Sequence, residues 1–481
     1  MSNTTQALSR IEAILDDSSF VEIGARVTAR ATDFNMQEKK APSDGVITGY
    51  GVVNGNLVYV YSQDASVLGG TIGEMHAKKI ASLYEKAMKM GAPVVGLIDC
   101  AGLRLQEATD ALNGFGEIYK NMSLASGIIP QITAVYGECG GGLAVLAELS
   151  DFVFVEEKKA KLFVNSPNAL DGNYESKLDT SSAKFMAEAG VVDFVGDEET
   201  IANGVRQLVS MLPSNNAEGT VCTDNQDDLN RVCQDMEAEI ADPALALTDI
   251  SDDGVFVEAK AEYAKEMVTG FILVDGVTVG AVANRTALYD ENGEKAEEFA
   301  PVLTTAGAYK AAEFVTFCNA FEIPVLPLTN VKGFEATVKS ERTIAKAAAK
   351  LVYAFSNADV PKVNIITGEA YGSAYVAMNS KSIGADMVYA WPQASIGMMD
   401  ASLAAKIMYA DDIAASKDVT STINEKAAEY AALQSSVDQA AARGYVDTII
   451  NPEDTRKYVA AAFEMLFDKR EVRADKKHGT V

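Results

Sequence analysis

Residues 137–142 of this chain have the sequence GECGGG, and residues 368–374 have the sequence GEAYGSA. Each segment follows a run of β-branched and apolar residues. Each is followed by a stretch with helical spacing, at 143–149 and at 375–383. The sequence therefore predicts the same local structure at two places: a strand, a turn of small residues and a helix.

The second half of the chain repeats the first. Three pairs of matching positions lie 231 residues apart: Pro93 and Pro324, Pro130 and Pro361, Gly137 and Gly368. A constant offset across separate motifs indicates the duplication of one ancestral fold. Turn-forming and polar residues cluster at 213–230, which is typical of a linker. We therefore predict two homologous domains, residues 1–230 and residues 231–481.

Strand-like and helix-like stretches alternate within the chain. Residues 57–61 and 94–98 are short runs rich in β-branched and apolar residues, and residues 73–90 between them have helical spacing. A further helix is expected over residues 452–467. Alternation of this kind is typical of α/β domains.

Composition disfavours several classes of function. The 481 residues include 41 Lys and Arg and 68 Asp and Glu, a formal net charge of −27, which repels nucleic acid. The five cysteines form no C-x-x-C pair, and the first residues lack the pattern of a secretory signal. No run of 18 apolar residues occurs. We expect a cytoplasmic protein that neither binds nucleic acid nor spans a membrane.

Most familiar catalytic groups are missing. The two histidines, His76 and His478, are too few for a multi-histidine metal site and make a histidine-based triad improbable, and no Walker loop or G-x-S-x-G motif occurs. We predict no metal. The two small-residue turns remain, since backbone N–H groups at a helix start suit a developing oxyanion. The alternative is that these glycines only form tight turns, but their duplication favours a function.

Four polar side chains near the start of the helix at 73–90 and after the strand at 94–98 allow two interpretations. His76 is either a packing and hydrogen-bonding residue, which is the simpler interpretation, or a catalytic base. Lys78, Lys79 and Arg104 either bind phosphates or are only solvated charges.

Longer motifs resemble a known family. They are residues 44–51 (DGVITGYG), 69–80 (GGTIGEMHAKKI), 125–131 (ASGIIPQ), 314–324 (FVTFCNAFEIP) and 389–392 (YAWP). These segments resemble the carboxyltransferase β subunits of propionyl-CoA and acetyl-CoA carboxylases, and the α subunit of sodium-pumping methylmalonyl-CoA decarboxylases. The resemblance runs almost from end to end of the chain.

The resemblance implies a duplicated crotonase-like (ClpP/crotonase) α/β fold and an enzyme that transfers a carboxyl group between carboxybiotin and acetyl-, propionyl- or methylmalonyl-CoA. Biotin is then carried by a separate biotin carboxyl carrier protein. The other partners implied are a biotin carboxylase subunit or a membrane decarboxylase subunit. The family also implies a dimer-based homo-oligomer, commonly a hexamer, with each site formed by the first half of one subunit and the second half of another.

The resemblance further implies roles for individual residues. Acyl-CoA would lie on the first half and carboxybiotin on the second, each beside one oxyanion hole. The backbone amides of the two holes would be those of Gly141 and Gly142, and of Ser373 and Ala374. The positions expected to contact the cofactor or the CoA ester are Gly372, Tyr371, Val376, Lys78, Arg104 and Gly102.

Two stretches depart from the family pattern. Residues 99–104 read DCAGLR where the family has DSGGAR, which adds bulk beside the expected CoA site, and residues 330–350 differ on the expected biotin side. Three alternatives therefore stay open. They are the decarboxylase component of a sodium pump, a non-catalytic subunit, and a biotin-independent crotonase for which Glu138 is the nearby carboxylate.

Overall fold

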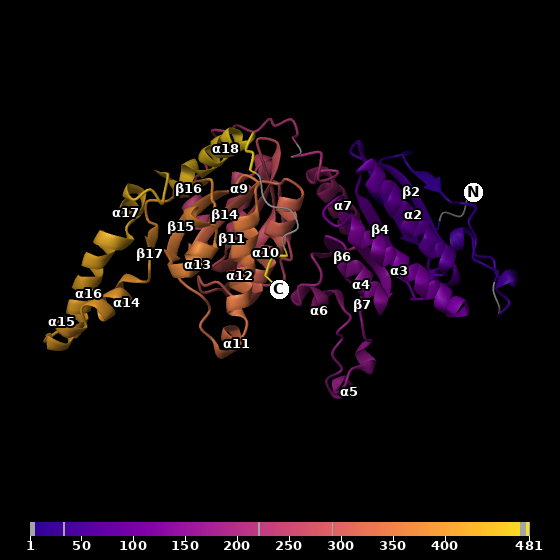
Figure 1. Ribbon diagram of the computed structural model, residues 1–481, viewed down its shortest axis with the longest axis horizontal. Helices are drawn as coiled ribbons and strands as arrows, with labels where there is room; N and C mark the ends of the chain where they lie inside the picture. Colours follow the sequence, from indigo (N-terminus) through magenta and orange to yellow (C-terminus); the bar gives the residue numbers. More distant parts are fainter. Residues whose placement is uncertain (1–4, 32–33, 220–221, 291, 472–477, 481) are drawn as a thin grey trace. The chain divides into compact units, whose positions relative to one another are not determined.

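The computed structural model of the chain describes residues 5–31, 34–219, 222–290, 292–471 and 478–480. The chain divides into two compact units (Figure 1). The first comprises Met1–Gly219 and Lys260–Tyr263, and the second comprises Thr220–Ala259 and Ala264–Val481.

The first unit is built on a mixed sheet with the strand order β1-β2-β3-β4-β5-β6-β8, and β7 pairs with β5. Its first three strands are antiparallel and the others pair in parallel. The strands are β1 (Val21–Ile23), β2 (Val46–Val53), β3 (Asn56–Gln63), β4 (Val94–Cys100), β5 (Gln131–Gly140), β6 (Phe152–Glu156), β7 (Lys161–Phe163) and β8 (Phe194–Gly196). The helices are α1 (Gln6–Ile14), α2 (Glu74–Met90), α3 (Ala108–Ala125), α4 (Gly142–Glu148), α5 (Asn173–Ser176), α6 (Ala183–Glu188) and α7 (Glu198–Met211).

The second unit repeats this topology with the strand order β9-β10-β11-β14-β15-β16-β18, and β17 pairs with β15. Its strands are β9 (Phe256–Ala259), β10 (Met267–Val274), β11 (Val277–Asn284), β14 (Val325–Val331), β15 (Val363–Tyr371), β16 (Met387–Ala390), β17 (Ser395–Gly397) and β18 (Thr448–Ile449), with a separate hairpin of β12 (Ala287–Tyr289) and β13 (Lys295–Glu298). The main helices are α8 (Met236–Glu239), α9 (Pro243–Ile250), α10 (Thr305–Ala320), α11 (Val338–Glu341), α12 (Ile344–Asn357), α13 (Gly372–Ala377) and α18 (Thr455–Leu466). The repeated strand order confirms the predicted duplication.

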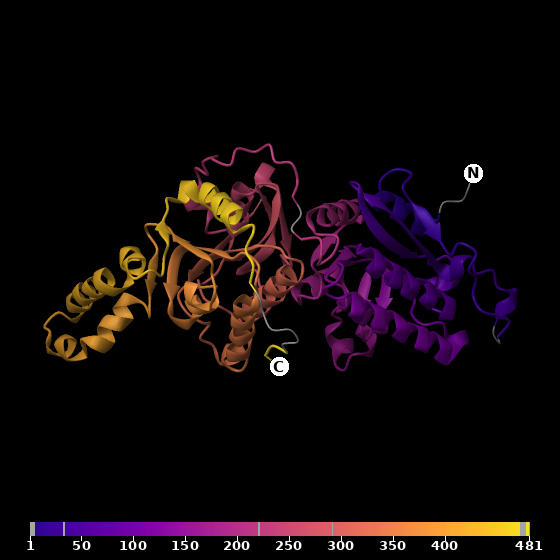
Figure 2. The same cartoon turned by 45° about the horizontal axis from the view of Figure 1, so that its top comes forward.

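The second unit also carries a helical arm inserted between β17 and β18. It consists of α14 (Ala401–Met408), α15 (Ala410–Ala415), α16 (Val419–Tyr430) and α17 (Val437–Ala442). Helices α14 to α16 extend away from the sheet in both views (Figures 1 and 2). Across the described part of the chain, we find no helix with the length and apolar character needed to cross a bilayer.

Apolar side chains fill the space between sheet and helices in each unit. In the first unit α2 and α3 pack on each other beside the sheet, and their buried members include Ile80, Tyr84 and Ile118. In the second unit α10 and α12 pack on each other in the same way. A separate apolar cluster of this unit contains the fully buried Trp391. Three predicted elements are confirmed. The strands predicted at 57–61 and 94–98 are β3 and β4, and the helix predicted at 73–90 is α2.

The two small-residue segments differ from the prediction. Residues 137–140 and 368–371 are not turns, because β5 continues to Gly140 and β15 continues to Tyr371. The physical reason is a short extra strand, β7 or β17, which pairs in parallel with each of these ends. The helix after the second segment is also shorter than expected, since α13 ends at Ala377 and a separate 3-10 turn covers Lys381–Ile383. The helix after the first segment, α4, agrees with the stretch expected at 143–149 to within one residue.

One ion pair joins the start of the first unit to its last helix. The guanidinium of Arg206, on α7, lies 2.8 Å from a carboxylate oxygen of Asp16 and donates to the carbonyl of Ile14. The other oxygen of Asp16 accepts the N–H of Gly55 in the β2–β3 hairpin turn. The pair thus ties α7 to the hairpin, and it lowers the pKa of Asp16 through its hydrogen bond to Arg206.

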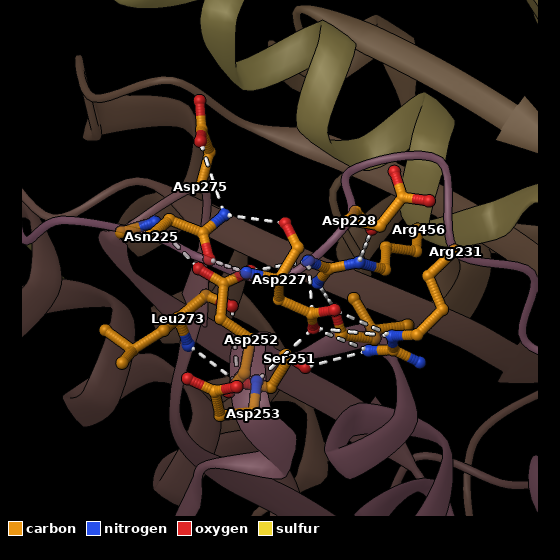
Figure 3. Close-up of polar contacts among 12 residues, drawn as sticks. Asn225, Asp227, Asp228, Arg231, Ser251, Asp252, Asp253, Leu273, Asp275 and Arg456 are labelled. Atoms are coloured by element: carbon orange, nitrogen blue, oxygen red, sulfur yellow. Dashed lines mark hydrogen bonds and ion pairs between the residues drawn. The ribbon is translucent and has the colours of Figure 1, made fainter.

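The second unit contains the same contact. Arg456, on α18, lies 2.7 Å from a carboxylate oxygen of Asp252, whose other oxygen accepts the N–H of Gly276 in the β10–β11 turn (Figure 3). Asp227 also pairs with Arg456, at 3.2 Å. The Arg456 side chain is completely buried, whereas that of Arg206 is 26% exposed. The offset of 231 did not reveal this recurring ion pair. The corresponding residues, Asp16 and Asp252 and likewise Arg206 and Arg456, are separated by other distances in the sequence.

The difference in burial predicts unequal effects of one substitution. Arg456→Ala leaves the buried carboxylate of Asp252 without its cation, which typically costs about 3–5 kcal/mol. Arg206→Ala removes the matching but partly solvated pair, so the loss of stability should be clearly smaller. Urea unfolding of both variants and the parent protein measures the two losses. Equal losses would show that burial does not govern this contact.

Candidate active site

Each strand-to-helix junction contains one glycine in the left-handed region. Gly141 has a φ of 64° and Gly372 has a φ of 62°, and the two residues are 231 positions apart. A residue with a β-carbon is strained at this angle, whereas glycine adopts it readily. The chain can therefore leave β5 or β15 and enter α4 or α13 within about one residue.

Of the two N–H groups predicted at the first junction, those of Gly141 and Gly142, one is already paired. The N–H of Gly141 donates to the carbonyl oxygen of Phe163 at 2.8 Å, because β7 runs beside the end of β5. It is already paired, which corrects the prediction that Gly141 donates to an oxyanion. The first N–H groups of α4 belong to Gly142 and Leu143, and they have no partner within the helix.

The second junction presents Ser373 and Ala374 in the same way. Both lie in the first turn of α13, where the N–H groups lack an intrahelical partner, and Ser373 is exposed. The offset of 231 relates Ser373 to Gly142 and Ala374 to Leu143. Sequence reasoning missed Leu143, although the constant offset applied to Ala374 contained the signal.

Three other predicted residues surround the second junction. Tyr371 is buried, and its hydroxyl donates to Oγ of Ser395 at 2.8 Å. Burial raises the pKa of Tyr371, so its hydroxyl stays protonated. Gly372 begins α13, and Val376 lies one turn further along with its side chain half-buried. These three residues therefore lie together in the second unit, at the end of β15 and in α13.

Arg104 has a different role from the one proposed for it. Its side chain is buried, and one guanidinium nitrogen lies 2.6 Å from Asp44 and 2.8 Å from Glu107. A second nitrogen donates to the carbonyl of Thr71. With these partners inside the protein, Arg104 is not available to CoA phosphates. This corrects the interpretation of Arg104 as a phosphate ligand, since ion pairing in the fold cannot be seen in local sequence.

Lys78 and Gly102 lie nearer the surface. Lys78 is 49% exposed and pairs with Glu74 at 2.6 Å, one helical turn earlier on α2. Glu74 also pairs with Arg30. Gly102, in the loop after β4, donates its N–H to Sγ of Cys100 at 3.4 Å, while its carbonyl accepts from Ile72. Lys78 is therefore accessible to an anion, whereas the backbone of Gly102 serves the loop itself.

His76 is a buried hydrogen-bonding residue. Its Nδ1 lies 2.9 Å from the carbonyl of Asp44, so Nδ1 carries the proton, and Nε2 accepts from the side-chain amide of Gln63 at 3.2 Å. Burial, assisted by Arg104, lowers the pKa of His76 to about 3. The imidazole is thus neutral and enclosed, which confirms the structural interpretation. Lys79 is also buried, and it donates to the carbonyls of Ser43 and Val46.

The remaining acidic groups do not form a metal site. Among the described residues, no group of three or more His, Cys, Asp and Glu side chains could hold a metal ion. Glu138 lies exposed on β5, where its backbone pairs with Lys161 of β7. The arrangement is therefore two backbone N–H pairs, each at the end of a parallel strand, with no buried histidine free to act as a base.

Comparison with known proteins identifies relatives over the whole chain. The family described as "Carboxyl transferase domain" matches residues 2–481. Methylmalonyl-CoA decarboxylase subunit alpha of Propionigenium modestum is 39% identical over 99% of this chain and 92% of its own length. Propionyl-CoA carboxylase beta chain of Roseobacter denitrificans is 38% identical, with coverage of 99% and 93%.

A solved structure gives the same result. The transcarboxylase 12S structure with methylmalonyl-coenzyme A and methylmalonic acid bound is 35% identical to this chain. It superimposes with a TM-score of 0.91 over 99% of this chain and 92% of that one, and it is described as a hexamer assembly. This similarity confirms the predicted fold, a duplicated crotonase-like α/β architecture.

The buried histidine predicts a pH dependence of stability. With a folded pKa of about 3 and an unfolded pKa of 6.5, the unfolded chain binds the extra proton between these values. His76 therefore contributes stability above pH 6.5 that is lost as the pH falls toward 3, by about 1.4 kcal/mol per pH unit. Urea unfolding between pH 7.5 and 4.5 should show this slope as the difference between the parent protein and His76→Gln.

The exposed His478 supplies the matched control for this measurement. His478→Gln should leave the slope as it is in the parent protein. A parallel pH dependence in His76→Gln and the parent would contradict the buried, neutral state of His76.

Proposed function

The chain belongs to the carboxyl transferase domain family, and from this we propose that it is an enzyme that transfers a carboxyl group between carboxybiotin and a short acyl-CoA. The observation that carries the proposal is the end-to-end family match on a chain with two equivalent strand-to-helix junctions. Each junction presents two backbone N–H groups that can bind one oxyanion. Carboxyl transfer between two carbonyl compounds requires two such sites.

The chain's own groups have defined roles in this proposal. The N–H groups of Gly142 and Leu143 hold the thioester oxygen of the acyl-CoA as negative charge develops on it. Those of Ser373 and Ala374 hold the ureido oxygen of biotin. Because these donors are fixed by the ends of β5 and β15, they need no reorganisation during the reaction. Carboxybiotin supplies the carboxyl group.

The binding positions follow the same division. Residues 1–230 are proposed as the acyl-CoA side, with exposed Lys78 as a phosphate contact and the loop of Gly102 beside the thioester. Residues 231–481 are proposed as the carboxybiotin side, with Tyr371, Gly372 and Val376 around the second junction. Acetyl-, propionyl- and methylmalonyl-CoA are the candidate substrates. Cys100 and Leu103, which are bulkier than the family's residues, are expected beside the site where the CoA ester binds.

Partners are proposed from the named relatives. Two relatives are subunits, of a methylmalonyl-CoA decarboxylase and of a propionyl-CoA carboxylase. We expect biotin to arrive on a separate biotin carboxyl carrier protein, together with a biotin carboxylase subunit or a membrane decarboxylase subunit. The hexamer assembly of transcarboxylase 12S supports a homo-oligomer of this chain. We expect this protein to be located in the cytoplasm.

A second candidate is decarboxylation, which uses the same junctions in the reverse direction. It is favoured by the 39% identity with the decarboxylase subunit of Propionigenium modestum. The two candidates are separated by the direction of net reaction. Release of carboxyl from methylmalonyl-CoA to a biotinylated carrier, without carboxylation of propionyl-CoA under matched conditions, would favour the decarboxylase.

The proposal is tested by exchange of a labelled carboxyl group. A biotinylated carrier loaded with labelled carboxyl is mixed with the protein and acetyl- or propionyl-CoA, and an unloaded biotinylated carrier is mixed with the protein and carboxyl-labelled methylmalonyl-CoA. Label that moves between carrier and thioester is counted. Transfer involving one of these thioesters is the expected outcome. Absence of transfer with all of them, while CoA esters still bind, would overturn it in favour of a non-catalytic or biotin-independent protein.

Ser373 allows one backbone donor to be removed selectively. Ser373→Pro deletes the N–H at an early helical position, where proline is compatible with the helix. The transfer rate should fall by about 10²–10³-fold, as for loss of one oxyanion donor. Ser373→Ala keeps the N–H and is the matched control, expected to retain near-parent kcat. A loss of equal size in both variants would contradict the role of the N–H.

A further inference from the structure

The hydroxyl of Tyr119 contacts the first junction from helix α3. It donates to the carbonyl oxygen of Gly142, with the two oxygens 2.5 Å apart. This carbonyl belongs to the same peptide unit as the N–H of Leu143. Because a peptide unit is planar and trans, fixing the direction of its C=O fixes the N–H in the opposite direction. The phenol therefore sets where the Leu143 N–H points.

The peptide that Tyr119 holds lies at the end of a run of glycines. Residues 140–142 are three consecutive glycines, and Gly141 already has a positive φ. Glycine populates positive and negative φ about equally, so Gly142 itself adds no steric preference to the orientation of this peptide, which is set by the start of α4. A side-chain hydrogen bond to the carbonyl of Gly142 adds a second restraint.

The space around Gly142 is shaped by the same two aromatic side chains. A β-carbon at this position would lie 2.5 Å from Cε1 of Phe115 and 3.0 Å from the hydroxyl of Tyr119. The rings of Phe115 and Tyr119 pack with their centroids 4.8 Å apart, and Phe115 is buried. The Tyr119 ring is thus held in place from α3, and its hydroxyl is aimed at the backbone of α4.

Tyr119 also remains a donor over the working pH range. Burial raises the pKa of its phenol, with a further contribution from Cys139. The hydroxyl is consequently protonated at neutral and mildly alkaline pH, and its hydrogen bond to the Gly142 carbonyl persists. That bond also polarises the amide, which strengthens the Leu143 N–H as a donor.

The second unit has no tyrosine at the corresponding place. The offset of 231 relates Tyr119 to Lys350 and Phe115 to Lys346, both on α12. The ammonium group of Lys350 lies 5.2 Å from the ring centroid of Tyr309. The aromatic pair beside the junction is therefore specific to the first unit, the proposed acyl-CoA side.

We propose that Tyr119 is a positioning residue, which holds the Leu143 N–H toward the thioester oxygen and so accelerates the acyl-CoA part of the carboxyl transfer. This inference rests on the proposed function. Tyr119 acts through the backbone and does not itself contact the substrate. Removing its hydroxyl leaves the N–H in place at the start of α4 but without this additional restraint, so the effect should be smaller than deletion of a donor.

The experiment uses the full-length protein with its biotinylated carrier and the variant Tyr119→Phe, which keeps the ring packed on Phe115. The kcat of transfer to the acyl-CoA should fall about 5- to 30-fold, below the ~10²–10³-fold loss on removing a donor, with the KM for acyl-CoA little changed. Decarboxylation of carboxybiotin measured without acyl-CoA should stay at the parent rate. Tyr50→Phe, on β2 and three strands from β5, is the matched control.

A second variant guards against a folding effect. Replacing Tyr119 by 3,5-difluorotyrosine keeps the shape but makes the phenol more acidic, so the alkaline limb of the kcat profile should move to lower pH. Unchanged kcat in Tyr119→Phe, or equal losses in both reactions together with an unmoved pH limb, would overturn the inference. Absence of transfer by the parent protein would instead refute the proposed function, and the role of Tyr119 with it.

Discussion

A positive φ at one glycine in each unit is the constraint on which the rest of the site is built. Gly141 and Gly372 let an extended strand turn into a helix within about one residue. The first N–H groups of α4 and α13 then lie directly beyond the ends of β5 and β15. The short strands β7 and β17 pair with these ends and fix them to the sheet. Two separate backbone donor sites are thereby held by rigid elements.

Most of the charged groups at the start of α2 and in the loop after β4 stabilise the fold. Arg104 is enclosed by Asp44 and Glu107, and Lys79 donates to backbone carbonyls, so neither meets solvent as a free cation. His76 is neutral and buried beside them. In a chain with a formal charge of −27, the proposed binding of an anionic thioester therefore relies on exposed groups such as Lys78 and on backbone N–H groups. Catalysis by fixed dipoles suits such a site.

Duplication has left the two junctions alike in backbone and different in surroundings. The strand order, the left-handed glycine and the arginine–aspartate pair recur in both units. By contrast, Phe115 and Tyr119 of α3 correspond to Lys346 and Lys350 of α12. This difference agrees with the proposed function, in which each site needs its backbone N–H groups and the two sites bind different ligands.

The sequence alone was sufficient for the α/β class, the duplication and the two junctions, because these depend on local periodicity, on glycine and on a constant offset of 231. It could not show that the N–H of Gly141 is paired with Phe163, or that Arg104 is enclosed by acidic side chains. It also could not show Tyr119 reaching the carbonyl of Gly142, 23 residues away. Contacts of this kind depend on how strands and helices distant in sequence pack together. Only the tertiary structure could decide which N–H groups are free to bind a ligand.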